Sequence, residues 1–582
     1  MNWKMSDAVD YKGFPADKAK TGGWISATLI LGIEICERMS TMGIAVNLVT
    51  YLIVTMHLPS AESANAVTDF MGTSFMLCLL GGFLADSFLG RYLTIAIFAA
   101  FQALGTGLLA VATKLPQLRP TPCNSDEQCN RATRIQLGML YLCLYIIALG
   151  TGGLKSSVSG FGADQFDETD EREKTQMSYF FNRFFFFIST GTLLAVTVLV
   201  YMQEELGRSW AYGICSVAMV VAIGVFLSGT KRYRYKKRFG SPVVYVIQVL
   251  VAALRKRNVV YKPGVSRFYE DQIQDNRIHQ TNQFCFLDKA AIMEESDYSD
   301  PAKANNDEVN WSLRRSSWRL CSVTRVEEVK MMIRLLPVWA TTILFWTIYA
   351  QMITFSVEQA ITMERSIGKN FQIPAGSSTV FLVGAILVTL AVYDRIVMPW
   401  WKKCKGTTGF NNLQKIGIGL FLSAIGMVVA ALVERRRLVV ARQVKTTMTT
   451  TQQNSRDTLP ISVFILIPQF LLVGTAEAFI YTGQLDFFIT QSPKGMKTMS
   501  TGLFLSTISL GFFLSSFLVS IIKIITGGKK GNGWLGDNIN NGRLDCFYGF
   551  LFVLSMVNLA AFIFCIAWKR QKSNKEAADE KC

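Results

Sequence analysis

The sequence predicts an all-α membrane protein with twelve transmembrane helices in two six-helix bundles. Half of the 582 residues are hydrophobic, and 17% are charged, against about 25% in soluble domains. Apolar segments near the ~20 residues that cross a bilayer as a helix recur along the whole chain. The twelve expected spans are residues 24–54, 66–85, 92–113, 136–160, 179–202, 210–229, 332–356, 375–393, 413–433, 460–489, 499–525 and 546–568.

Loop charges predict the orientation of these spans. An even number of spans places both termini on one side, and loops rich in Lys and Arg favour the cytoplasm. Basic residues crowd both tails and the segment after the sixth span, so we expect cytoplasmic termini and a multi-pass protein of the plasma membrane, with the vacuolar membrane left open. One loop disagrees, because Arg435, Arg436, Arg437 and Arg442 follow the ninth span on the expected outer side. The net charge of +17 reflects this loop bias and not nucleic-acid binding.

A long polar stretch divides the spans six and six, and it exceeds ordinary connections between helices. We expect it to contain a short amphipathic helix or to be partly disordered. The predicted organisation is a cytoplasmic N-terminal tail at 1–23, a six-helix bundle at 24–230, a cytoplasmic linker at 231–325, a second six-helix bundle at 326–568 and a cytoplasmic tail at 569–582.

Charged residues within the expected spans are the main indication of function. Glu34, Glu37 and Arg38 lie in the first span, where residues three and four apart share one helix face. Intramembrane charges are costly and usually face a water-filled cavity on an ion or proton path. Lys155 in the fourth span needs a counter-ion, and the first-span glutamates are its natural partners. Glu477 in the tenth span is the remaining deep carboxylate.

The segment from Gly82 to Arg91, after the second span, resembles the loop signature of the major facilitator superfamily. Asp86 and Arg91 can pair with each other and with neighbouring helix ends, which would latch an inner gate. The resemblance implies the major facilitator fold, in which substrate binds between the two halves near the membrane midplane.

The charged set Glu34, Glu37 and Arg38 with Lys155 resembles the motif of the proton-coupled nitrate and peptide transporter family. Further strings resemble its plant branch, closest to the low-affinity nitrate transporters: Asp10–Gly13, Asn182–Ile188, Tyr481–Phe488 and Gly495–Leu503. The resemblance implies that the first-span residues bind and pass the coupling proton and that Lys155 is a switchable partner. It also implies a central cavity to which Glu477 contributes, with protons as the coupling ion and no cofactor.

Histidine has no part in the predicted coupling, because His57 and His279 both lie away from the centres of the spans. By the same resemblance, Tyr349 stands where a related nitrate transporter has an anion-holding histidine. A phenol donates one hydrogen bond but cannot become cationic, so we expect weaker anion binding and shifted anion preference. Ser189 departs from the peptide-transporter signature and argues mildly against peptides.

Two modifications are also predicted. Thr94 lies in a basic-x-x-Thr pattern and aligns with a phosphorylated threonine of the related nitrate transporter, so a regulatory kinase is a predicted partner. Cys123 and Cys129 lie in the expected outer loop after the third span, where a disulfide could persist. The aromatic run Phe184–Phe187 could line the cavity, but lipid contact and packing is the favoured expectation.

The predicted function is low-affinity import of nitrate, a small anionic substrate, by a proton-coupled symporter that works by alternating access; the chain is not an enzyme. Chloride, a plant metabolite or hormone, and di- or tripeptides remain alternative substrates. A nitrate-sensing membrane receptor and an uncoupled anion channel remain alternatives from other classes. The sequence lacks a phosphate-binding loop of an ATP-driven pump, and nothing in it resembles a carbonyl selectivity filter.

Overall fold

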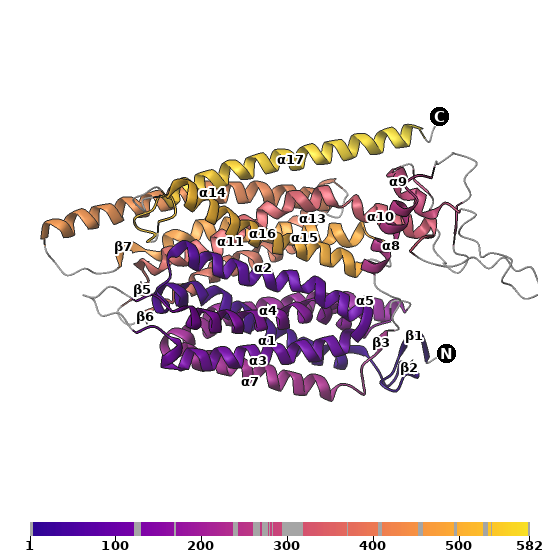
Figure 1. The fold of residues 1–582 in the computed structure, drawn as a ribbon, viewed down its shortest axis with the longest axis horizontal. Coiled ribbons are helices and arrows are strands. Elements are labelled where there is room, and N and C mark those ends of the chain that lie inside the picture. Colours follow the sequence, from indigo (N-terminus) through magenta and orange to yellow (C-terminus); the bar gives the residue numbers. More distant parts are fainter. Residues whose placement is uncertain are drawn as a thin grey trace, which may run out of the picture.

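The computed structural model describes residues 4–121, 130–167, 170–236, 242–259, 268–270, 278, 280–281, 283–293, 318–368, 371–405, 410–451, 458–493, 497–527, 533–536 and 538–579. Two helical halves lie side by side (Figure 1), the first in indigo to magenta and the second in orange to yellow. The all-α membrane fold predicted from composition is confirmed. Cys123 and Cys129 lie outside the described residues.

The first half contains six long helical arms. Several continue beyond their α-helix through short π-helical or 3₁₀ segments, and Gly207 with φ 100° separates the fifth arm from the sixth. The elements are α1 (Gly23–Thr50) with η1 (Tyr51–Thr55), α2 (Ser60–Leu84) with η2 (Ala85–Leu89), α3 (Arg91–Lys114) with η3 (Pro116–Leu118), α4 (Arg134–Ala163), α5 (Glu171–Leu194) with η4 (Ala195–Leu199), α6 (Val200–Met202) and η5 (Gln203–Gly207), and α7 (Arg208–Ser228).

The second half also contains six long helical arms within the described residues. They are α11 (Leu336–Ile361), α12 (Val380–Val392) preceded by η9 (Gly376–Thr379) and followed by η10 (Tyr393–Val397) and α13 (Met398–Lys405), α14 (Asn412–Thr451), α15 (Ile467–Thr490) preceded by η11 (Val463–Leu466), α16 (Lys497–Thr526) and α17 (Leu544–Asp579).

Hydropathy alone marks ten helical runs in the described residues as long and apolar enough to cross a membrane. One of them, Arg183–Ser228, contains both the apolar part of α5 and α7. The charged helix α1 is not among the ten. Counting α5, α7 and α1 as separate arms gives the twelve that the sequence predicts.

Both ends of the chain lie at one end of the bundle, which we call the tail end. Here β1 (Lys4–Val9) pairs antiparallel with β2 (Pro15–Asp17) and with β3 (Tyr235–Lys236), which follows α7. The linker helices α8 (Pro242–Arg255), α9 (Cys285–Asp288) with η6 (Lys289–Ala291), and α10 (Val323–Ile333) lie at the same end (Figure 1). In α8, Val249, Ala252 and Ala253 are buried while Leu250 and Leu254 are exposed, so both faces of this short helix carry apolar side chains.

The opposite end, which we call the far end, carries short strands (Figure 1). β4 (Met363–Glu364) pairs with β7 (Leu459–Ser462), and β5 (Ser366–Ile367) pairs with β6 (Phe371–Gln372). Arg437 of α14, one of the arginines that contradict the loop-charge bias, is fully buried there and pairs with Glu434 at 2.7 Å. Glu434 therefore neutralises this charge inside the protein, so Arg437 does not count against the orientation predicted from the loop charges.

Candidate functional site

A cavity of about 2470 Å³ lies between the two halves. Its lining reaches the tail end, where Asp10, Tyr11 and Lys236 belong to it. Five of the polar residues singled out from the sequence line its deep part: Glu34, Arg38, Lys155, Tyr349 and Glu477. The cavity therefore brings together predicted residues from α1 and α4 in one half and from α11 and α15 in the other.

Close helix contacts place the charged side chains of the first half. A Cβ at Gly81 of α2 would lie 2.6 Å from the Cα of Gly153 in α4, so these helices approach to backbone contact two residues before Lys155. A Cβ at Gly191 of α5 would lie 3.2 Å from the Cβ of Arg38. Small residues at these crossings leave no room for the lysine and arginine to turn back between the helices, so their side chains extend toward the cavity.

The ion pairs of this charged cluster are long. Lys155 Nζ lies 3.9 Å from Glu37 Oε1, Arg38 Nη2 lies 3.6 Å from Glu34 Oε1, and Arg38 Nε lies 3.9 Å from Glu37 Oε2. Charge-assisted N–H···O bonds are typically about 2.7–2.9 Å long. Within the described residues, Glu34 Oε2, Glu37 Oε2, Arg38 Nε and Lys155 Nζ are buried without a hydrogen-bond partner. The four charges attract one another but do not satisfy one another.

Three residues that the sequence analysis did not single out support the charged cluster. Lys155 Nζ lies 4.3 Å from the centroid of the Phe75 ring, a cation–π contact. Behind Glu37, Thr41 donates to Glu37 Oε1 at 2.8 Å and lies 3.0 Å from the Thr151 hydroxyl. Helical spacing could have found both threonines, because Thr41 follows Glu37 by four residues and Thr151 precedes Lys155 by four.

The facing wall of the second half is aromatic. Tyr349 on α11 hydrogen-bonds Glu477 of α15 and is almost fully buried. Trp346 stands edge-on to it at 5.6 Å between ring centroids, and Tyr481 is 6.3 Å from Trp346. The sequence reasoning assigned Trp346 no role and used Tyr481 only as part of a family string.

Tyr481 also contacts the first half, with its ring centroid 6.4 Å from that of Phe185. Phe184, Phe185 and Phe186 line the cavity, so the structure supports the less favoured of the two expectations for three of the four residues. Side chains at successive helix positions point in different directions. The cavity beside α5 is broad enough to be lined by several consecutive side chains.

At the far end, the two halves touch directly. Ser516 of α16 donates to Asp69 of α2 at 2.5 Å and lies 2.5 Å from the Thr68 hydroxyl. Asn65 donates to Ser520 at 3.0 Å. An ion pair between Glu204 and Arg365, 3.7 Å long, joins the halves at the same end. The cavity thus extends to the tail end, while polar contacts hold the far end together.

The residues predicted for the inner gate lie at the cavity mouth. Asp86 and Arg91 both line it, and Arg91 Nη1 lies 2.6 Å from Asp164 Oδ2 at the end of α4. Lys236 Nζ lies 3.7 Å from the other oxygen of Asp164. Asp164, at a neighbouring helix end, is therefore an ion-pair partner of Arg91. Thr94 is fully buried and donates to the Gly90 carbonyl at 2.9 Å.

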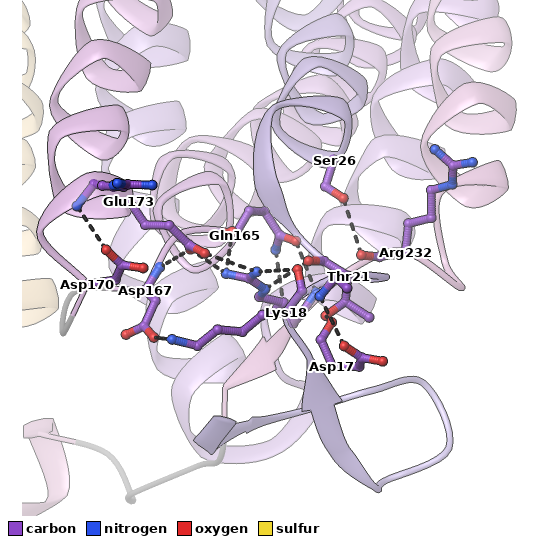
Figure 2. Close-up of polar contacts among 12 residues, drawn as sticks. Asp17, Lys18, Thr21, Ser26, Gln165, Asp167, Asp170, Glu173 and Arg232 are labelled. Carbon is purple, nitrogen blue, oxygen red and sulfur yellow. Dashed lines mark hydrogen bonds and ion pairs between the residues drawn. The ribbon is translucent and has the colours of Figure 1, made fainter. Parts of the chain in front are cut away.

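A separate polar network ties the N-terminal tail to the first half (Figure 2). Lys18 Nζ lies 2.5 Å from Asp167 Oδ2, and this hydrogen bond raises the pKa of Lys18 above its ordinary value. Buried Arg234 pairs with Glu173 at 2.6 Å and donates through Nε to the Thr21 carbonyl at 3.0 Å. The network joins the tail, the α4–α5 connection and the segment after α7 into one unit.

The sequence profile of the POT family matches residues 92–535. The chain belongs to the POT family. Protein NRT1/PTR FAMILY 6.2 of Arabidopsis thaliana is 64% identical over 579 residues, which cover 100% of this chain and 97% of that protein. Protein NRT1/PTR FAMILY 6.3 of the same plant is 52% identical and covers 98% and 95%. The resemblance inferred from the charged motif is thereby confirmed.

Solved structures of POT family members share the fold. An auto-inhibited POT family peptide transporter aligns with a TM-score of 0.67 at 18% identity, covering 94% of this chain and 97% of that chain. The POT family transporter PepTSo aligns with a TM-score of 0.65 at 19% identity, covering 94% and 99%. The chain is a multi-pass membrane transporter of this family, and the described residues contain no cluster of His, Cys, Asp and Glu that could hold a metal ion.

Proposed function

We propose that this POT family transporter is a proton-coupled symporter that imports a small anion, nitrate first among the candidates. The observation that supports this most is the unsatisfied charged cluster at the deep end of the cavity, formed by Glu34, Glu37, Arg38 and Lys155. Two acids and two bases are close enough to attract one another, yet their hydrogen bonds remain available to protons and substrate.

Charge balance explains how such a cluster couples protons to an anion. With both glutamates ionised, the two negative and two positive charges cancel. Each proton that binds Glu34 or Glu37 adds one positive charge beside Arg38 and Lys155, and the low-dielectric surroundings strengthen its attraction for an anion. Two protons and one nitrate would therefore enter together with a net positive charge, and without protons the anion would meet a neutral site.

Tyr349, Glu477 and Lys155 are the proposed substrate contacts. In the structure, the Tyr349 hydroxyl is engaged with Glu477, across the cavity from the charged cluster. When Glu477 carries a proton, the phenol is free to donate a hydrogen bond to an anion held beside Lys155. The single neutral donor at Tyr349 gives a weak contact, in keeping with low-affinity transport.

Alternating access follows from the two ends of the bundle. We assign both termini to the cytoplasm, so the cavity that reaches the tail end is the inward-facing state. The outward-facing state requires the far-end contacts of Ser516 to separate. It also requires the two halves to close at the tail end, around Asp86 and Arg91. A regulatory kinase would reach Thr94 only in a state that uncovers the start of α3, because the side chain is fully buried here.

Chloride is the second candidate, and Tyr349 is the observation that favours it. A phenol in place of an imidazole offers no cation to either anion. At this position, therefore, only ion shape and hydration can distinguish chloride from the flat nitrate ion. The named relatives point in two directions, since the curated ones carry NRT1/PTR names and a solved one is a peptide transporter.

The test is uptake of labelled nitrate, chloride and a dipeptide by the full chain in proteoliposomes, with the outside at acidic or neutral pH. Nitrate uptake that requires the inward proton gradient supports the proposal. Anion flux that persists without a gradient would identify a channel, and binding without uptake would identify a receptor. Gradient-driven uptake of chloride alone would identify chloride as the substrate in place of nitrate, and uptake of the dipeptide alone would identify a peptide transporter.

A further inference from the structure

One buried carboxylate that the proposed function does not use lies away from the charged cluster, at the far end of the bundle. Glu358 is near the end of α11, is almost fully buried, and does not line the cavity. Its neighbour across the interface is Ser60, the first residue of α2 in the other half, whose hydroxyl is a hydrogen-bond donor to the carboxyl group. Glu358 Oε2 has no hydrogen-bond partner within the described residues.

The nearest cation is committed elsewhere. Arg437 of α14 holds Glu434 through two hydrogen bonds of 2.7 and 2.8 Å and donates further to Thr362 at 3.0 Å. Glu434 in turn accepts from Gln359 at 2.5 Å. The Glu434–Arg437 pair is therefore neutral as a unit and leaves Glu358 without a counter-ion among the residues that the structure describes.

Other charged groups on the surrounding elements do not supply one either. On α2, Glu62 is a second carboxylate and is ion-paired with Arg131. On α16, Lys523 lies in the last turn and has its own interactions, and on α17 the nearby titratable group is the Tyr548 phenol. Charge–charge effects on Glu358 come chiefly from Arg437 and Glu434, which act in opposite senses.

An ionised carboxylate that is buried without a cation costs several kcal/mol, so such groups take up a proton instead. In the far-end-closed structure Glu358 is accordingly protonated. Separation of the halves would part α11 from Ser60 and admit water to the carboxyl group, which would then ionise at neutral pH. Protonation and closure of the far end are therefore linked, because the same carboxyl group cannot be both buried and charged.

We propose that Glu358 is a proton-binding site of the far-end gate, by which we mean the contacts that close the far end. This site is distinct from the charged cluster. The inference rests on the proposed function, since it assigns the far end to the outside of the cell. External protons neutralise Glu358 and permit the gate to close behind substrate. When the far end opens again, Glu358 releases its proton to the external solution. Glu358 thus contributes to the external pH dependence of uptake, beside the charged cluster, without adding to the protons carried per anion.

The first experiment compares Glu358→Gln with wild type in oocytes, with Glu364→Gln as the matched control. Glutamine keeps the contact with Ser60 and cannot ionise, and Glu364 is an exposed carboxylate six residues further along at the same end. The expected result is that Glu358→Gln raises uptake at neutral external pH toward its acidic level, while the ratio of charge to anion stays unchanged. The control keeps the wild-type profile.

An unchanged pH profile in Glu358→Gln would overturn the inference, and a changed charge-to-anion ratio would also overturn it by making Glu358 a transported-proton site. Failure of the proposed function is recognised separately, because wild type would then show no acid-driven anion uptake.

A second measurement does not depend on transport. Ser520→Cys places a thiol on α16 at the far-end contact with Asn65. A membrane-impermeant thiol reagent should label it faster at pH 8 than at pH 6, above the background of the unsubstituted protein. Because the thiolate is the reacting species, pH alone also speeds labelling, so in the Ser520→Cys and Glu358→Gln double variant the difference should shrink to that caused by ionisation of the thiol. Labelling that is equally pH-dependent in both proteins would contradict the proposal.

Discussion

Two buried charge clusters in this transporter contain the same kinds of charged group but differ in the length of their ion pairs and in how many of their hydrogen bonds are formed. The far-end pair of Glu434 and Arg437 is 2.7 Å long, and its guanidinium makes further bonds to Thr362 and the Ile539 carbonyl. The cavity cluster pairs Lys155 with Glu37 at 3.9 Å and leaves four buried polar atoms without hydrogen bonds. Both clusters are largely buried, where an unpaired charge is expensive.

If the proposed function is correct, the difference separates an ion pair that stabilises the fold from a charged cluster that takes part in transport. A charge pair whose hydrogen bonds are complete fixes its helices and resists any change of protonation. A cluster held by attraction across nearly 4 Å can gain a proton or an anion without first breaking a short bond. Bond length and unused donors, more than burial, therefore indicate which intramembrane charges take part in transport.

The largest expected effect tests the cavity cluster. Glu37→Gln should reduce proton-driven uptake to background, because it removes a proton acceptor and leaves Lys155 unpaired at depth. Glu34→Gln and Lys155→Ala should do the same, with the protein still present in the membrane. Labelled-anion uptake at acidic external pH, normalised to surface protein, measures this. Full acid-stimulated uptake in Glu37→Gln would remove Glu37 from the proton path.

The next effect tests the tight pair. Arg437→Gln leaves Glu434 as an uncompensated buried charge and should destabilise the fold by about 3–5 kcal/mol. The melting temperature in detergent should fall, and less protein should reach the membrane, while the molecules that do reach it still take up the anion under an inward proton gradient. A variant with normal stability that has lost proton-driven uptake would instead assign this pair to transport.

A smaller effect is expected at the aromatic wall. Tyr349→His replaces a neutral donor by one that becomes cationic in acid, because an unperturbed imidazole titrates near ~6.5. A charge-assisted bond exceeds a neutral one by about 1 kcal/mol, so nitrate binding should strengthen roughly 5-fold at low pH. Competition of chloride against labelled nitrate at external pH of about 7 and 5.5 reports this. A preference unchanged at both values would show that Tyr349 does not touch the anion.

The smallest effect concerns the partly exposed pair of Lys18 and Asp167. Such pairs contribute at most about 1 kcal/mol, so Lys18→Gln should lower the melting temperature only slightly. The pKa of Lys18 is raised, chiefly by the hydrogen bond from its ammonium to Asp167, so its contribution is complete below its ordinary pKa of 10.5 and is lost as pH rises through the folded value. Melting curves of both proteins should differ at pH 8 and converge in stronger alkali. A difference that persists there would point to packing of the lysine stem.

Much of the fold and part of the site could be predicted from the sequence. Apolar segment length fixes the spans, and charges such as Glu34 and Lys155 stand out because so few occur at depth. Their meeting across α1 and α4 was inferred from the cost of isolated charge, and the measured pairing of Lys155 with Glu37 follows that inference.

Other features depend on packing between distant segments, which the local pattern does not encode. Asp164 as the partner of Arg91 lies on another helix end, and Tyr481 reaches the cavity only because α15 faces α5. Buried Arg437 looked like a loop charge, since a one-dimensional pattern cannot show that Glu434 neutralises it three residues away within a longer helix. Glu358 was missed because it lies at a span end, where glutamate is ordinary.

The small sheet at the tail end has a consequence for biosynthesis. β1 begins at Lys4, but its partner β3 consists of Tyr235 and Lys236, which follow all six helices of the first half. At about 5–20 residues per second, the ribosome needs roughly 10–50 seconds to make the intervening chain. During that interval the basic N-terminal segment has no strand partner on that side and stays available to direct membrane insertion. Pairing with β3 then occurs only after the sixth helix of the half has been made, so the sheet marks the completion of the first bundle.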